Sequence, residues 1–132
     1  RLEAIERLWE AIGRAEGGDT VGFCLDTCHA HAGGADLGSV VEKVRAVTGR
    51  IDLVHCNDSR DEFDSGADRH TNLGNGHIAD ADIAHVVREA GAPVVVETPG
   101  GTEGQRADID WLREHRTMPI GEYHRAADLA PT

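Results

Sequence analysis

Short apolar runs alternate along this chain with segments of helical periodicity, and this order constrains the fold more than any other feature. The runs are mainly apolar and three to five residues long, and they cover residues 21–25, 51–54 and 94–96. The helical segments have apolar residues three or four positions apart, and they cover residues 2–12, 37–47, 83–87 and 109–112. Strands of this kind between helices are typical of a parallel sheet covered by helices, so the sequence predicts an α/β fold.

Three strands are too few to close a barrel. The sheet is therefore either small and open, or it is about three-eighths of a (βα)8 TIM barrel. The 132 residues are expected to form a single partial domain, 1–132, with an irregular tail over 117–132. The first residue is Arg1 rather than Met and a helical pattern starts at once, which favours a fragment of a longer protein.

The charge balance bears on the choice of partner. The chain has 13 Lys and Arg against 24 Asp and Glu, a net charge of −11. This sign opposes binding to DNA, because affinity for phosphate normally comes from Lys and Arg, although bound divalent cations would reduce the deficit locally. Three cysteines, no signal-peptide pattern and no apolar run of membrane-spanning length favour a cytoplasmic protein that does not enter a membrane.

Each of the three apolar runs ends in a side chain that can bind a metal: Asp26, His55 and Glu97. In parallel α/β folds the carboxyl ends of the strands carry the active site. Polar residues often follow strands simply because loops are polar, and a single such residue would have no weight. Three residues of ligand type at equivalent positions favour a metal site, and this mixture suits zinc and also manganese or iron.

Two further clusters extend this set of ligands. His29 lies three positions after Asp26, and Asp68 and His70 lie two apart in a long polar segment, 57–77, that is predicted to be a loop. An extended Asp-x-His places both side chains on one face, although a solvated loop would also explain the triplet. Six candidate ligands exceed the three or four that one zinc ion takes, so the sequence predicts at least two metals.

Five segments carry a resemblance to a known family. Residues 23–30 resemble the "LDTCH" segment of endonuclease IV, the family 2 abasic-site endonucleases, and 55–59 resemble its "HLNDS" segment. Residues 68–70 match "DRH", 72–78 resemble the Gly-rich "GEGxIG" turn, and 96–99 resemble "LETP". The five segments occur in the family's order.

The resemblance implies a (βα)8 barrel, of which this chain would form about the last three βα units. It also implies a DNA-repair endonuclease with three zinc ions that hydrolyses the phosphodiester 5′ to abasic sites in double-stranded DNA. The implied ligands of one zinc are His29, Asp68 and His70. Those of a second, which would also be the catalytic residues, are Asp26, His55 and Glu97. A bridging glutamate and two histidines that the family has upstream have no counterpart here, so the ligand set of this chain is incomplete.

Several other residues receive secondary roles. Asn57 and Arg69 are candidate DNA contacts, and Asp58 is a candidate for orienting a ligand imidazole. Cys24, within an apolar run, is expected to be a small core residue, and His77 is a reserve candidate near the site. The family usually has a Gly-Ser-Arg run before its DRH, whereas this chain has residues 64–66, Asp-Ser-Gly, and so lacks one basic residue.

Two alternatives remain open. One is a metal-dependent TIM-barrel sugar isomerase or epimerase, which uses a similar set of carboxylates and histidines but lacks the Asp-x-His cluster. The other is an inert fragment that binds one zinc. An incomplete barrel would expose strand edges and an apolar face, so self-association of the chain is expected.

Overall fold

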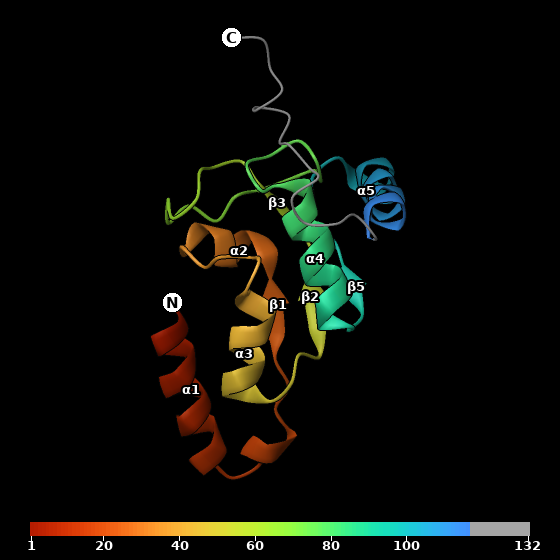
Figure 1. The fold of residues 1–132 in the computed structure, drawn as a ribbon. Helices are drawn as coiled ribbons and strands as arrows, with labels where there is room; N and C mark the ends of the chain where they lie inside the picture. The colour runs from red at the N-terminus through yellow and green to blue at the C-terminus, as the bar shows by residue number, and fades with distance from the viewer. Residues whose placement is uncertain (117–132) are drawn as a thin grey trace.

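The computed structural model describes residues 1–116, which form a three-stranded parallel sheet with helices packed against it (Figure 1). The strand order is β1 (Cys24–Asp26), β2 (Leu53–His55) and β5 (Val94–Val95). Both pairs, β1 with β2 and β2 with β5, are parallel. The predicted α/β class and the parallel strands are confirmed. The predicted tail, 117–132, lies outside the described residues.

Four longer helices occur where the periodicity predicts them. They are α1 (Leu2–Arg14), α3 (Val40–Thr48), α4 (Asp80–Ala90) and α5 (Gly101–His115). Consecutive helices contact one another, α3 with α4 and α4 with α5, while α1 packs on α3 (Figure 1). Two short elements were not predicted from the sequence: a 3-10 helix, η1 (Gly18–Thr20), and α2 (Thr27–Ala32). Both are too short to produce a clear apolar period.

The strands are shorter than their apolar runs. The first was predicted over 21–25, but residues 21–23 lie outside β1. The Phe23 main-chain N–H donates to the Asp52 carboxylate at 2.8 Å, so it is bonded to a side chain at the place where a longer ladder would continue. The apolar pattern carries no information about which backbone groups are paired.

The two faces of the sheet differ in burial. Leu25 and Val54 are paired in register and lie on the face toward the helices, where both are buried. They belong to a core with helical and loop residues, including Val40, Val41, Val44, Ile83, Val86, Leu73 and Ile78. Cys24, Leu53 and Val95 lie on the opposite face, and Val95 is 42% exposed.

Cys24 is exposed, so its predicted place in the core is wrong. Its neighbour Leu25 takes the buried position because successive side chains of a strand point to opposite faces. The same alternation places Asp26 on the face of Cys24, away from the helices.

The polar segment 57–77 is not a loop throughout. It contains β3 (Asp58–Ser59) and β4 (His70–Thr71), which pair antiparallel. The Arg60 N–H donates to the Arg69 carbonyl at 3.0 Å and extends this contact by one more bond. Two-residue strands of polar composition have no apolar alternation to reveal them. The hairpin returns Asp68 and His70 to the carboxyl end of the sheet.

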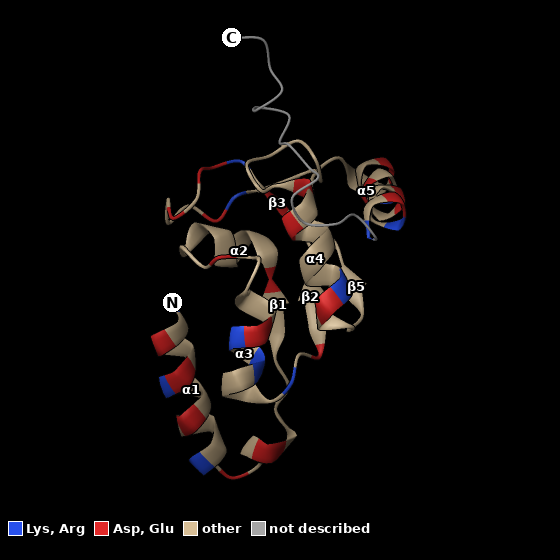
Figure 2. Cartoon of the chain, in the orientation of Figure 1, with Lys and Arg blue, Asp and Glu red and all other residues tan. Residues whose placement is uncertain are grey.

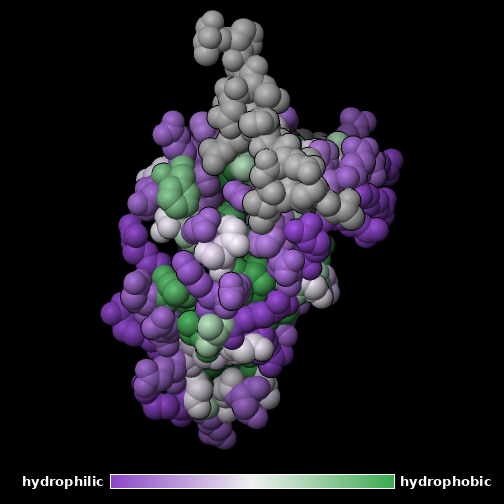
Figure 3. All heavy atoms as spheres, in the orientation of Figure 1, coloured by the Kyte–Doolittle hydropathy of each residue, from purple (hydrophilic) through white to green (hydrophobic). Residues whose placement is uncertain are grey.

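The surface is mostly hydrophilic in the view of Figure 3, with hydrophobic side chains in separate small areas. Among residues 1–116 the structure has no helix that is both long and apolar enough to cross a membrane. The self-association expected from the sequence stays a prediction.

Candidate metal centre

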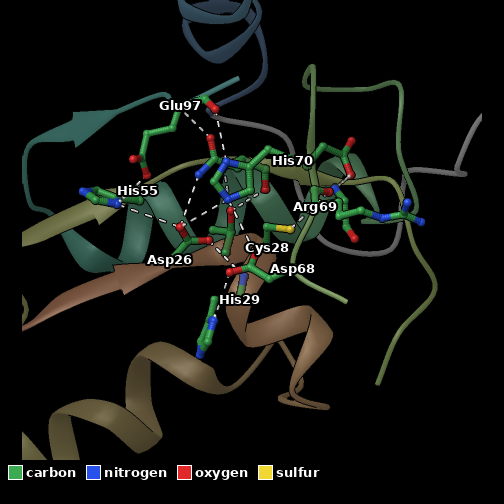
Figure 4. A network of polar contacts seen from close by, with 12 residues as sticks. Asp26, Cys28, His29, His55, Asp68, Arg69, His70 and Glu97 are labelled. Atoms are coloured by element: carbon green, nitrogen blue, oxygen red, sulfur yellow. Dashed lines mark hydrogen bonds and ion pairs between the residues drawn. The ribbon is translucent and has the colours of Figure 1, made fainter. Parts of the chain in front are cut away.

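The carboxyl ends of the three parallel strands bring together Asp26, His55 and Glu97. His55 Nδ1 lies 2.6 Å from Glu97 Oε1 and 3.9 Å from Asp26 Oδ2 (Figure 4). One ligand atom from each residue lies within 4.8 Å of the other two. The parallel register explains this meeting, because Asp26 is paired with His55 and the chain reaches Glu97 two residues after Val95 in the next strand. The three residues that end the apolar runs therefore form one cluster, as the sequence predicts.

The hairpin adds a second group beside the first. His70 Nε2 lies 3.5 Å from Asp68 Oδ1 and 3.8 Å from Asp26 Oδ2, so Asp26 borders both groups (Figure 4). His29 Nδ1 lies 3.2 Å from Asp68 Oδ2. These contacts link all six candidate ligands, but the second group of ligand atoms within 4.8 Å of one another consists of Cys28, Asp68 and His70, without His29.

The start of α2 explains how Asp26 and His29 reach the same site. Asp26 is the N-cap of α2, and its Oδ1 accepts a hydrogen bond from the His29 N–H at 2.9 Å. The second oxygen, Oδ2, is the one that faces His55 and His70. The cap therefore fixes which carboxylate oxygen points into the cluster.

A backbone contact orients the imidazole of His70. Its Nδ1 lies 3.1 Å from the main-chain carbonyl of Glu97. A carbonyl oxygen can only accept, so Nδ1 donates this bond, and Nε2 is the nitrogen that faces Asp26 and Asp68. Metal-binding histidines commonly have their second nitrogen held in this way.

Cys28 is a neighbour that the ligand prediction omitted. It is fully buried, and its Sγ lies within 4.8 Å of ligand atoms of Asp68 and His70. The thiol donates to the Arg69 carbonyl at 3.7 Å. Burial, followed by the hydrogen bond with Asp68, raises the pKa of Cys28 to about 12, so the thiol is protonated near neutral pH. In the sequence, the only sign that Cys28 lies near the site is its position next to His29.

Asp68 is in an environment suited to a charged carboxylate. Burial acts to raise its pKa, but hydrogen bonds from His29 and Cys28 outweigh that effect, and the pKa is lowered. The carboxylate is therefore ionised near neutral pH, which is the form that binds a cation.

Two secondary predictions need correction. Asn57 is fully buried, and its side chain is bonded to Asp26 and to the Glu97 N–H, so it is not available to contact DNA. Asp58 is also fully buried and orients no imidazole; its carboxylate accepts four main-chain N–H bonds, from Ser59, Gly74, Gly76 and Ile78. Burial raises the pKa of Asp58 although these bonds oppose the shift. Both residues follow His55 closely in the chain, and only the tertiary contacts reveal that they point inward.

Arg69 and His77 lie outside the cluster. The Arg69 guanidinium extends away from it and pairs with both oxygens of Asp61, at 2.9 and 2.5 Å (Figure 4). Its side chain is 60% exposed, so a DNA contact by Arg69 stays a prediction. His77 belongs to neither group of converging ligand atoms within the described part of the chain.

Divalent metals fit this set of donors. Imidazole nitrogens and carboxylate oxygens are the ligands that zinc, manganese and iron accept, and those of Asp26, His55 and Glu97 converge at the carboxyl ends of the parallel strands. The side chains of Asp26 and His70 are 21% and 24% exposed, which separates them from ordinary surface acids and histidines.

Comparisons with known proteins find sequences and a solved structure that are similar to this chain. Residues 2–115 match the family described as "Xylose isomerase-like TIM barrel". A protein of Mycobacterium leprae named "Probable endonuclease 4" is 55% identical over 114 residues, which are 86% of this chain and 43% of that protein. One of Mycobacterium tuberculosis with the same name is 53% identical over 115 residues, again 86% of this chain and 43% of the relative.

A solved structure is also similar. It is a crystal structure of endonuclease IV from Thermus thermophilus, with a TM-score of 0.65 and 29% sequence identity, and the match covers 83% of this chain and 44% of that one. The chain therefore spans less than half the length of these relatives. The resemblance to endonuclease IV is confirmed by these matches, and the chain belongs to the xylose isomerase-like TIM-barrel family.

Proposed function

We propose that this chain supplies part of the zinc site of a DNA-repair endonuclease that hydrolyses the phosphodiester 5′ to abasic sites. The observation that carries the proposal is the convergence of Asp26, His55 and Glu97 at the ends of three parallel strands, next to Asp68 and His70. The relatives named probable endonuclease 4 support the nuclease class.

In this proposal Asp26, His55 and Glu97 hold one ion and His29, Asp68 and His70 hold another. Bound divalent metals would supply an activated water at neutral pH and neutralise charge on the phosphate. The chain's own residues would fix the positions of these ions. Glu97, whose side chain is 48% exposed, is also placed to orient a water molecule at the open side of the cluster.

The acidic charge of the chain is compatible with this role if cations occupy the cluster. Figure 2 shows acidic residues on β1 and on the loops at the carboxyl end of the sheet, with fewer basic ones. Without bound cations, Asp26, Asp68 and Glu97 would repel a phosphate. The proposal therefore requires that metal binding precede binding of DNA.

The family's description as "Xylose isomerase-like TIM barrel" favours a second candidate function, that of a sugar isomerase or epimerase. A sugar isomerase or epimerase would also use carboxylates and imidazoles around a divalent metal. Conversion of an aldose to a ketose by the metal-loaded chain, without cleavage of DNA, would favour that function over the nuclease.

The experiment combines metal analysis with a cleavage assay. The purified 132-residue chain is analysed for zinc by mass spectrometry and incubated with a duplex that contains one abasic site, with and without EDTA. Asp26→Asn removes one proposed ligand, and Asp19→Asn, at an exposed position of η1, is the matched control. An undamaged duplex tests the requirement for the lesion.

Cleavage 5′ to the abasic site that is lost with EDTA and with Asp26→Asn, but kept with Asp19→Asn, would support the proposal. Bound zinc without cleavage would restrict the chain's own role to holding metal. A wild-type chain that binds no zinc would overturn the proposed coordination.

A further inference from the structure

The amide side chain of Asn57 joins two strand ends at the centre of the candidate site. Its Nδ2 donates to Asp26 Oδ2 at 3.3 Å, and its Oδ1 accepts from the Glu97 main-chain N–H at 2.8 Å. An amide suits this place because it offers a donor and an acceptor side by side. A carboxylate would lack the donor, and an apolar side chain would lack both.

A second contact fixes Asn57 itself. Thr27 Oγ1 donates to the Asn57 carbonyl at 2.6 Å and accepts from the Asn57 N–H at 2.8 Å. Asp26 and His55 are the last paired residues of β1 and β2. Directly beyond them, the Thr27 hydroxyl binds both the N–H and the carbonyl of Asn57, as a backbone partner would. Thr27 and Asn57 are both fully buried, so water does not compete for these bonds.

The bond to Asp26 uses the same oxygen that faces the two histidines. Asp26 Oδ2 lies 3.9 Å from His55 Nδ1 and 3.8 Å from His70 Nε2, while Oδ1 is held by the His29 N–H. With one oxygen capped and the other bonded to Asn57, the carboxylate has little freedom to rotate. The bond to the Glu97 N–H holds the next strand end at a fixed position relative to that carboxylate.

We propose that Asn57 is the positioning residue of this site, which sets the position of Asp26 relative to Glu97 so that the ligands are arranged before metal binds. This inference rests on the proposed metal site and adds to it a residue that is not itself a ligand. Hydrogen-bond partners that orient metal ligands typically change metal affinity by about 10- to 100-fold when they are removed.

The test uses Co²⁺ as the metal, because its visible absorption reports the geometry of the ligands. Co²⁺ is titrated into the full chain for the wild type, Asn57→Ala and Asn57→Asp. Thr48→Val is the matched control. It removes another buried hydroxyl, bonded to Val44 and Arg50 carbonyls, far from the site along α3, and so costs stability without touching the site.

The expected result for Asn57→Ala is a Co²⁺ affinity lower by about 10- to 100-fold and an altered spectrum at saturation. Asn57→Asp keeps the shape of the side chain but replaces the donor to Asp26 with a second carboxylate. Its spectrum should also depart from the wild type, which keeps the test informative if Asn57→Ala does not fold. Thr48→Val should bind Co²⁺ with the wild-type affinity and spectrum.

Wild-type affinity and spectrum in a folded Asn57 variant would overturn the positioning role and leave the proposed function standing. The same change in Co²⁺ affinity and spectrum in Thr48→Val would also overturn the positioning role, because loss of stability alone would then explain the change. A wild-type chain that binds no Co²⁺ would contradict the metal site and the role of Asn57 together.

Discussion

The His55 imidazole lies 2.6 Å from the Glu97 carboxylate, although β3, β4, α4 and β5 all lie between the two residues in the sequence. Asp26, at the end of β1, is 3.9 Å from the same nitrogen. A divalent cation at this point would be within reach of one ligand atom from each of the three residues. The geometry makes Glu97 the most direct position at which to test the cluster.

Glu97→Gln should weaken zinc binding by at least about tenfold, because the amide keeps the shape of the side chain but loses the charge that attracts the ion. Zinc affinity is measured by competition with a chromogenic chelator. The control is Glu89→Gln on the exposed surface of α4, which should bind zinc as the wild type does. Unchanged affinity in Glu97→Gln would remove Glu97 from the proposed ligand set.

Gly76→Ala should destabilise the fold by about 1–3 kcal/mol. A Cβ at this position would collide with the Ser59 carbonyl oxygen and the Asp58 carboxylate, which is buried and bonded to the Gly76 N–H. The free energy of unfolding is measured in urea. Gly13→Ala within α1 meets no atom within 4 Å and should instead stabilise the chain by roughly 0.5–1 kcal/mol. Similar effects of the two substitutions would contradict the close packing at Gly76.

Ile83→Ala should cost about 2–5 kcal/mol of stability. This side chain lies on the buried face of α4, is fully buried in the core, and leaves a cavity when it is shortened. Ile109→Ala makes the same chemical change on α5 at a position that is 42% exposed, and should cost less than about 1 kcal/mol. Urea midpoints of the two variants provide the comparison. A larger loss at Ile109 would place the core elsewhere.

Asp52→Asn should lower the melting temperature near neutral pH but have little effect at about pH 2. The Arg50 guanidinium, with further help from the Phe23 N–H, lowers the pKa of Asp52 to about 2. Because folding lowers the pKa, the charged carboxylate stabilises the fold fully at pH values above about 4, the pKa of Asp in the unfolded chain. This stabilisation is lost as the pH falls through about 2, the pKa of Asp52 in the folded chain.

Melting temperatures measured across that range test this directly. Arg50→Gln removes the same ion pair from the other side and should show the same dependence on pH. A difference between Asp52→Asn and wild type that stays constant down to about pH 2 would exclude the ion pair as its source.

Local patterns in the sequence were enough to predict the parallel α/β architecture and to locate the candidate site at the strand ends. Short apolar runs between helical segments indicate parallel strands, and parallel strands necessarily present their carboxyl ends at one edge. Asp26, His55 and Glu97 could therefore be grouped without coordinates, and the structure brings them together.

The side chains that join or support this group could be identified only from the folded chain. The burial of Asn57, the contact of Cys28 with the Arg69 carbonyl, and the pairing of Arg69 with Asp61 all depend on positions that the fold brings together. The hairpin of β3 and β4 is likewise specified by backbone pairing and by the buried Asp58 carboxylate, not by apolar periodicity. Such contacts form only when the folded backbone fixes distances between remote residues, and no local pattern records those distances.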